Sequence, residues 1–203
     1  MTFTSEVNIL AASSNGNNDV LYPMQHPLSK TDLFKLKGGL TLFLMGLAVP
    51  ILLLFEMRYI VAGGYVAPQV TQWLAIAATV VLLLTGVLTL AGSRSAKSGN
   101  QQSIIRNYNW ALLLGLVAIV LIGIPAFNGT LDPVTHYGET FIPTMGTVDV
   151  YLFFTWIGML ATRSRVKRLG SKIENYWGVY ATNIVLWFVF VCWVVTWIQL
   201  YYL

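Results

Sequence analysis

Long apolar runs separated by short polar segments make up most of the chain after its first 36 residues. Five of these runs reach about the length of 20 residues that an α-helix needs to cross the hydrocarbon core of a membrane. They cover approximately residues 38–60, 71–92, 109–127, 143–162 and 178–202. The fourth run is the least apolar, because Pro143, Gly146 and Asp149 interrupt its beginning. The pattern predicts an all-α membrane protein that folds as a bundle of five transmembrane helices.

The distribution of basic residues predicts the direction in which these helices cross the membrane. Eleven of the twelve Lys and Arg residues lie before the first run, between the second and third, or between the fourth and fifth. They are Lys30, Lys35, Lys37, Arg94, Lys97, Arg106, Arg163, Arg165, Lys167, Arg168 and Lys172. Only Arg58 falls on the other side. Because cytoplasmic segments are enriched in Lys and Arg, we predict that the N-terminus is inside and the C-terminus outside.

A polar segment, residues 1–36, precedes the first run. Within it, residues 13–19 consist only of Ser, Asn, Gly and Asp, which favour turns over regular structure. The segment lacks the layout of a signal peptide, so we expect the first transmembrane helix to direct insertion. We therefore predict a partly disordered tail on the cytoplasmic side, followed by a transmembrane domain over residues 37–203.

Composition agrees with the membrane class. The chain of 203 residues is 56% hydrophobic and only 10% charged, with a mean hydropathy of +0.67, and one soluble core does not bury so much apolar material. The net charge of +4 comes from residues between the apolar runs, so we expect no nucleic-acid partner. The single cysteine, Cys192, lies inside an apolar run, so this chain alone builds neither a disulfide framework nor a cysteine-ligated metal site.

Residue types argue against redox chemistry in this chain. Haem, copper and di-iron sites between membrane helices need histidine or carboxylate clusters as ligands. The two histidines, His26 and His136, both lie in polar segments outside the predicted helices. The sequence also has no P-loop, dinucleotide-binding fingerprint, nucleophile elbow or zinc motif. We therefore predict that the chain holds no catalytic residue, no cofactor-binding residue and no metal ligand.

Asp149 is the one ionisable group that lies deep in a predicted helix. It precedes Arg163 by 14 residues, which places it roughly 21 Å from the inner edge of the hydrocarbon core and about 9 Å below the outer edge. A carboxylate at that depth should face protein rather than lipid. One interpretation is a proton or ion pathway. The other, which we favour, is a structural acid that bonds to another subunit or to a neighbouring group such as Thr147, Tyr151 or Asn183.

Two groups of charged residues are expected at the membrane surfaces. Glu56 lies 19 residues beyond Lys37, a distance that reaches the outer headgroup region, so Glu56 and the adjacent Arg58 are assigned to the outer interface. A basic anchor on the cytoplasmic side can contact anionic lipid headgroups. It consists of Arg163, Arg165, Lys167, Arg168 and Lys172.

Several segments resemble subunit III of the haem–copper oxidases, in its short bacterial form with five helices. Residues 42–59 are similar to that family's opening helix, which begins Leu-Phe-Leu and ends in aromatic and basic residues. Residues 146–151, Gly-Thr-Val-Asp-Val-Tyr, occupy the place of a glycine followed by a paired-histidine segment. Residues 174–179, Glu-Asn-Tyr-Trp-Gly-Val, and the aromatic residues after them resemble the family's last helix. The resemblance covers roughly residues 36–203.

Polar residues typical of that family are replaced in this chain. The acid in the first helix of that family falls near Gly46 or Leu47 of this chain. The histidines of the family's fourth helix fall near Val148 and Tyr151, and the His and Asp of its last helix fall on Trp187 and Phe190. The roles of those polar residues therefore do not carry over, and what carries over is architectural.

The resemblance implies a non-catalytic supporting subunit of a terminal oxidase in aerobic electron transport, with cytochrome c or quinol as the electron donor. Members of the family pack against the catalytic subunit, hold phospholipids between their helices and support sustained turnover. We accordingly expect haem and copper in partner subunits, lipids among the bound molecules, and a multi-pass location in a bacterial inner membrane. Small residues such as Gly38, Gly39, Ala78 and Gly115 are expected to permit close helix packing.

Two other functions are compatible with the same residues. The chain can be a scaffold subunit of another membrane redox complex, such as a copper monooxygenase or a quinol-oxidising assembly. Alternatively it is a small transporter or channel subunit that uses Asp149 as its coupling acid. An optical spectrum of the intact complex separates the first alternative from an oxidase, and transport by the purified chain tests the second.

Overall fold

The structure, a computed structural model, describes residues 27–68, 70, 72–127 and 131–203. Within them five α-helices are long and apolar enough to cross a membrane, and no strand is found. The helices are α2 (Lys30–Ala62), α3 (Gln72–Lys97), α4 (Gln101–Phe127), α5 (His136–Leu169) and α6 (Trp177–Tyr201), and the short 3-10 helix η2 (Gly170–Lys172) joins the last two. The predicted all-α class and the five long apolar helices are confirmed.

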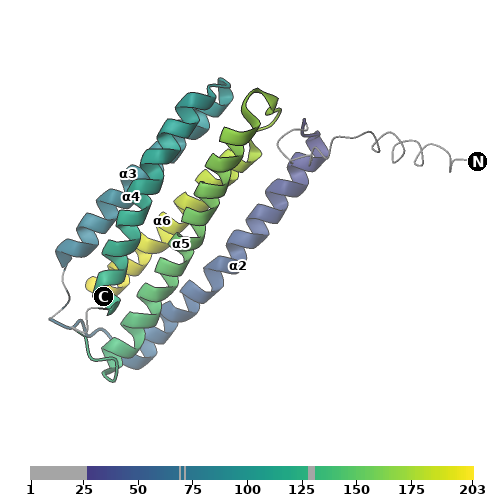
Figure 1. The fold of residues 1–203 in the computed structure, drawn as a ribbon. Coiled ribbons are helices and arrows are strands. Elements are labelled where there is room, and N and C mark those ends of the chain that lie inside the picture. The colour runs from purple at the N-terminus through teal and green to yellow at the C-terminus, as the bar shows by residue number, and fades with distance from the viewer. Residues whose placement is uncertain (1–26, 69, 71, 128–130) are drawn as a thin grey trace, which may run out of the picture.

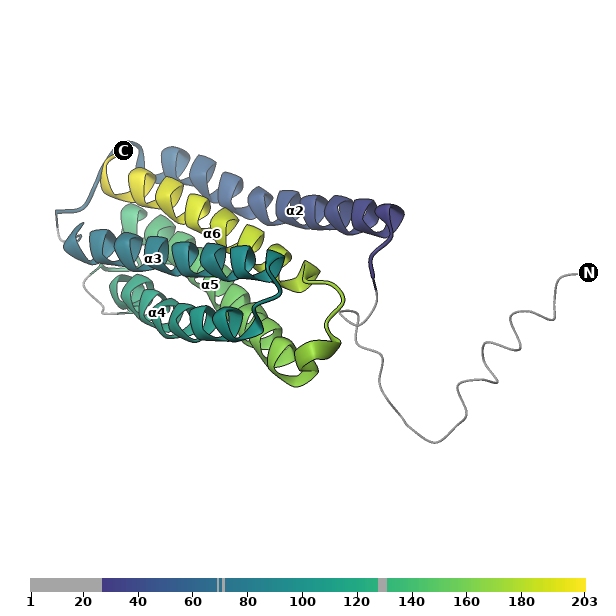
Figure 2. The same cartoon turned by 90° about the horizontal axis from the view of Figure 1, so that it is seen from above.

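Helices α3, α4, α5 and α6 form a four-helix body in which each helix packs against two of the others. Helix α2 packs on the outside of this body, against α5 and α6. Figure 2 shows α2 and α4 on opposite sides of the molecule. Only Ile51 and Arg58 of α2 are buried, whereas every other long helix buries at least eight residues. Helix α2 therefore contributes little to the core, which the four-helix body forms.

Helix α2 begins earlier than the sequence pattern indicates. Ser29 caps it, because its hydroxyl oxygen accepts a hydrogen bond from the backbone N–H of Asp32 at 3.1 Å. The helix thus includes residues 30–36, which the sequence assigned to a partly disordered tail. Residues 1–26 of that tail lie outside the described residues. The helix ends at Ala62, and Gly63 after it has a φ of 55°, a conformation that side-chain-bearing residues adopt at a cost.

Small residues let the helices of the body approach closely. A Cβ atom on Gly115 of α4 would lie 3.2 Å from the Trp156 ring of α5, and one on Gly92 of α3 would lie 3.0 Å from the Tyr108 ring of α4. The prediction for Gly115 is therefore confirmed. Gly38 and Gly39 behave differently, because nothing lies within 4 Å of either position. They lie on the part of α2 that extends away from the body, so they do not bring helices of this chain together, and their packing against another subunit stays a prediction.

Hydrogen bonds between helices fix the body at several depths. The Trp156 indole N–H donates to the Leu112 carbonyl at 2.8 Å, which joins α5 to α4. The Trp193 indole N–H donates to the Thr79 hydroxyl at 2.9 Å, which joins α6 to α3. Such bonds satisfy polar groups that have no water to bind in an apolar environment.

The up-and-down course of the chain collects charge at one end of the molecule. The connections α3–α4 and α5–α6 lie at the same end as the start of α2, and we name this the basic end (Figure 1). It carries eleven of the twelve Lys and Arg residues. The opposite end, named the far end, carries the connections α2–α3 and α4–α5, the C-terminus and Arg58.

Candidate functional site

An apolar groove with a volume of about 510 Å³ runs between α2, α5 and α6. Ten residues line it: Phe43, Leu47, Val150, Tyr151, Phe154, Thr155, Gly158, Ala181, Thr182 and Val185. Few of these side chains offer a polar atom to a ligand, so the groove suits a hydrocarbon chain rather than a polar metabolite. We name it the α2 groove.

The α2 groove exists because α2 touches the body only along part of its length. Pro50 has no backbone N–H, so the Gly46 carbonyl lacks its helical donor and the helix is weakened there. One turn of helix away from Pro50, the Tyr151 hydroxyl of α5 donates to the Leu47 carbonyl at 3.0 Å. Nearer the far end, the Gln199 side chain of α6 donates to the Phe55 carbonyl at 3.0 Å. These bonds hold the half of α2 that lies nearer the far end. The half nearer the basic end stands apart from the body.

Sequence reasoning placed Tyr151 among the buried polar residues but did not find the groove that it lines. Gly158 and Ala181 line it as well, and their small size on facing helices is the only signal in the sequence. Small residues equally permit tight packing, as Gly115 does. Whether a small residue lines a groove or permits tight packing depends here on where α2 lies, and the sequence pattern of one helix does not encode that position.

Asp149 lies on α5 and faces α4, on the side of the body away from α2. Its Oδ1 atom is buried and has no hydrogen-bond partner among the described residues. Its Oδ2 atom lies over Gly123 of α4, where an added Cβ would be 3.3 Å from it. A shallow cavity of about 360 Å³ lies beside the carboxylate and is lined by Ile119, Val120, Gly123, Ile124, Phe127 and Asp149. We name it the Asp149 cavity.

The expected hydrogen-bond partners of Asp149 all bond elsewhere. The Thr147 hydroxyl donates to the Pro143 carbonyl at 2.8 Å, and the Tyr151 hydroxyl donates to Leu47 on α2. The Asn183 side-chain oxygen accepts from the Thr89 hydroxyl of α3 at 3.1 Å. The predicted bond from Asp149 to one of these groups is therefore wrong. Positions 149 and 151 point about 200° apart on a helix, which is why the structure does not bring them together.

Glu56 and Arg58, both assigned to the outer interface, differ in their exposure. Glu56 is exposed, but Arg58 is only 1% exposed and lies at the end of α2. Its guanidinium donates to the carbonyls of Gly63, at 2.6 Å, and Tyr65, and lies 5.0 Å from the centre of the Tyr137 ring. Both carbonyls lie just beyond the end of α2, and the turn at Gly63 brings them back toward the cation. The assignment of Arg58 to the outer interface stays a prediction, and the structure adds that its side chain is buried at this helix end.

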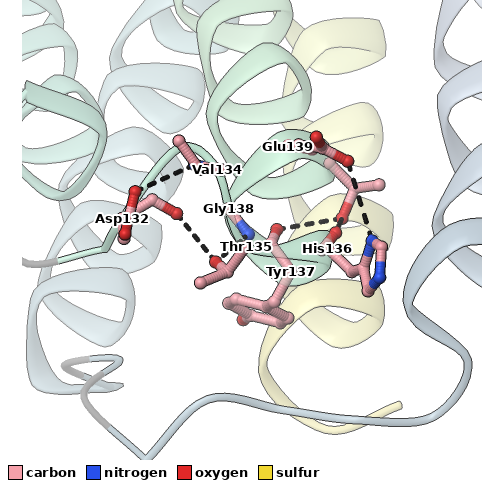
Figure 3. A network of polar contacts seen from close by, with 8 residues as sticks. Asp132, Val134, Thr135, His136, Tyr137, Gly138 and Glu139 are labelled. Atoms are coloured by element: carbon pink, nitrogen blue, oxygen red, sulfur yellow. Dashed lines mark hydrogen bonds and ion pairs between the residues drawn. The ribbon is translucent and has the colours of Figure 1, made fainter.

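The start of α5 is shaped by the loop before it (Figure 3). The Asp132 carboxylate accepts from the N–H of Val134 at 2.9 Å, and the Asp132 carbonyl accepts from the Thr135 hydroxyl at 2.7 Å. That hydroxyl in turn accepts from the N–H of Gly138 at 3.1 Å and so caps the helix. His136 lies beside Glu139 at 3.9 Å, and both are exposed. Among the described residues, no group of three or more His, Cys, Asp or Glu side chains is placed to hold a metal ion.

The basic anchor lies at the basic end of α5 and in η2. Arg165, Lys167, Arg168 and Lys172 are exposed, so their charges are available to an anionic surface. Arg163 is half-buried and donates to the Asn109 side chain of α4. The anchor therefore combines one arginine that ties two helices together with two arginines and two lysines that face outward.

Neither protein-family models nor curated proteins show a match to this chain.

Proposed function

We propose that the chain is a non-catalytic, subunit III-like membrane subunit of a haem–copper terminal oxidase. The haem and copper belong to partner subunits, and the chain supplies apolar surfaces, bound phospholipid and support for sustained turnover. It lies in a bacterial inner membrane with the basic end in the cytoplasm, because eleven of the twelve basic residues gather at that end.

The α2 groove is the observation that carries this proposal. The segment Gly146–Tyr151, which resembles the family's fourth helix, contributes Tyr151 to the groove and to the bond that holds α2. The segment that resembles the beginning of the last helix leads directly into Ala181 and Thr182 on the opposite wall. Segment 146–151 and the part of α6 that follows segment 174–179 thus border a space of the size and apolar character that a phospholipid chain requires, as the resemblance implies.

The outer surface supports the same role. Large apolar side chains on all five long helices are exposed, including Phe43, Trp73, Val120, Phe154 and Val191. In a membrane these surfaces meet lipid or the helices of other subunits. A supporting subunit needs both kinds of contact and no redox ligand of its own.

Purification of the intact complex tests the proposal. Membranes are solubilised in a mild detergent, the tagged chain is isolated with its partners, and the optical spectrum is recorded with and without carbon monoxide. We expect a co-migrating high-spin haem that binds carbon monoxide and an equimolar copper signal in the metal analysis. A stable complex without high-spin haem overturns the oxidase proposal and favours a scaffold of another redox assembly.

Removal of the chain tests the supporting role separately. In membranes from a strain without it, we expect oxygen consumption to begin at close to the normal rate and then to decay faster during turnover. Re-expression of the chain serves as the control and should restore the slow decay. If the rate is lost from the first turnovers, the chain takes part in catalysis itself, contrary to the proposal.

A further inference from the structure

Asp149 has a hydrogen-bonding need that the described part of this chain does not meet. Its Oδ1 atom is buried without a partner, while the other polar side chains nearby on α5 bond to carbonyls. The residue lies about 9 Å inside the outer edge of the hydrocarbon core if the basic end marks the inner edge. A carboxyl group in that environment requires a donor, since water does not reach it freely.

None of the described residues supplies this donor. Within the described residues the only ion pair is His136–Glu139, at the far end. The basic residues of α4 and α5, among them Arg106 and Arg163, lie toward the basic end. A second copy of the chain, inserted in the same direction, does not supply the donor from its described residues. Its Arg58 is buried against its own carbonyls, and its His136 precedes Asp149 by 13 residues of α5, so it lies about 20 Å nearer the far end. Lipid chains carry no donor.

We infer that the Asp149 cavity is the docking site for a transmembrane helix of a partner subunit that carries a Lys, Arg or His side chain at this depth. The inference rests on the proposed function, in which the chain works inside a larger membrane complex. Charge complementarity selects the partner, because a cationic donor satisfies the carboxylate and is itself stabilised by it.

The surroundings of Asp149 fit a helix better than a small ligand. Gly123 leaves room beside the carboxylate, and Val120, Ile124 and Phe127 form an apolar rim along one face of α4. A helix that lies along α4 covers this rim and reaches Asp149 with a single polar side chain. The site lies on the side of the body opposite α2, so a partner here leaves the α2 groove free for lipid (Figure 2).

Site-specific photocross-linking in the intact complex tests the inference. A benzoylphenylalanine is introduced at Val120, which lines the Asp149 cavity and is 54% exposed. The matched control carries the same probe at Val80 of α3, which is 52% exposed. We expect Val120 alone to cross-link to one transmembrane segment of one partner, and the cross-linked peptide to contain a Lys, Arg or His.

Dependence on the acid distinguishes docking from mere proximity. With Asp149→Leu the yield from Val120 should fall about tenfold or more, and with the similarly sized Asp149→Asn it should fall less, in line with the loss of a charge pair. The two charges can also be exchanged, with Asp149→Lys in this chain and the partner's cationic residue changed to Asp. This exchange should restore the cross-linking yield from Val120. Size-exclusion and thermal melting of the Asp149→Leu chain serve as folding controls, and this variant should be at least as stable alone as the parent.

Three results overturn the inference: adducts with lipid only at Val120, a cross-linked segment without a cationic residue, or a yield that Asp149→Leu leaves unchanged. Transport by the purified chain that is lost in Asp149→Asn also overturns it, because Asp149 is then a coupling acid. The haem spectrum of the same complex reports on the oxidase proposal independently, so the two proposals can fail separately.

Discussion

Arg58 illustrates how one residue closes a helix end in an apolar environment. Its guanidinium has several donors in a planar fork, and two of them reach carbonyls beyond the end of α2. The Tyr137 ring provides a second favourable surface for the cation. The charge therefore links α2 to the start of α5, although no carboxylate pairs with it among the described residues.

Replacement of Arg58 tests this role. We expect Arg58→Met to lower the free energy of unfolding by about 3 kcal/mol, because each hydrogen bond to a charged group contributes roughly 1.5–3 kcal/mol. Arg58→Lys should retain only part of this contribution to the free energy of unfolding, since one ammonium group does not reproduce the planar fork of donors. Unfolding in mixed detergent micelles, followed by tryptophan fluorescence, measures both. Equal stability of all three proteins would show that the buried cation contributes nothing.

Gly138 provides a second prediction at the scale of single residues. A Cβ atom there would lie 2.1 Å from the Asp132 carbonyl oxygen, which is backbone and does not move aside easily. We expect Gly138→Ala to destabilise the protein by roughly 1–3 kcal/mol, the usual range for overpacking. Gly146 lies on the same helix with nothing within 4 Å, so Gly146→Ala is the control and should gain up to about 1 kcal/mol.

Among the elements, α2 differs most from the others. It is long and apolar, yet it buries only Ile51 and Arg58 against the body. Its attachment through Tyr151 and Gln199 uses two backbone carbonyls of α2, near Pro50 and toward the far end. An element held by so few contacts leaves space beside it, and the α2 groove is that space.

Filling the α2 groove should displace lipid. Gly158 lines it and has nothing within 4 Å, so Gly158→Phe is expected to place a ring in the groove without a clash. We expect native mass spectrometry of the purified chain to show several-fold less retained phospholipid for this variant than for the parent. Gly146→Phe puts the same ring on α5 outside the groove and should leave lipid retention unchanged. Equal loss in both variants would mean that the lipid binds elsewhere.

For the whole molecule, the antiparallel course of the helices produces two ends and two sides with different chemistry. The basic end collects charge that favours the cytoplasmic face, and the far end carries the capped loop before α5. One side holds the α2 groove and the other the Asp149 cavity. A supporting subunit with this arrangement can hold lipid on one side and a partner helix on the other.

Chemical labelling tests the proposed orientation. Ser98, in the α3–α4 connection, and Pro133, in the α4–α5 connection, are both exposed. In intact spheroplasts, a membrane-impermeant maleimide should modify Pro133→Cys and spare Ser98→Cys until the membrane is permeabilised. The native Cys192 is buried, so the parent protein serves as the unlabelled control. Labelling of Ser98→Cys in intact spheroplasts would contradict the proposed orientation and indicate the opposite one.

Prediction from the sequence succeeded for the long apolar helices and was incomplete where a polar side chain must meet a particular neighbour. The five long apolar helices follow from hydropathy alone, because an apolar run of this length needs no partner to satisfy its backbone. The groups of this chain that were expected to bond to Asp149 do not do so, and the burial of Arg58 against its own turn was not predicted. Both depend on which neighbour a side chain faces, and helical spacing within one element does not specify that.

The sequence by itself therefore determined the class of the fold, the number of long helices and the collection of basic residues at one end, since each depends on residue type and order along the chain. Only the tertiary structure decided that α2 stands apart from the body, that Tyr151 holds it, and that Asp149 lies over Gly123 without a donor among the described residues. These features arise from how neighbouring helices contact one another, and apolar helices can pack in many ways with similar burial until particular side chains select one arrangement.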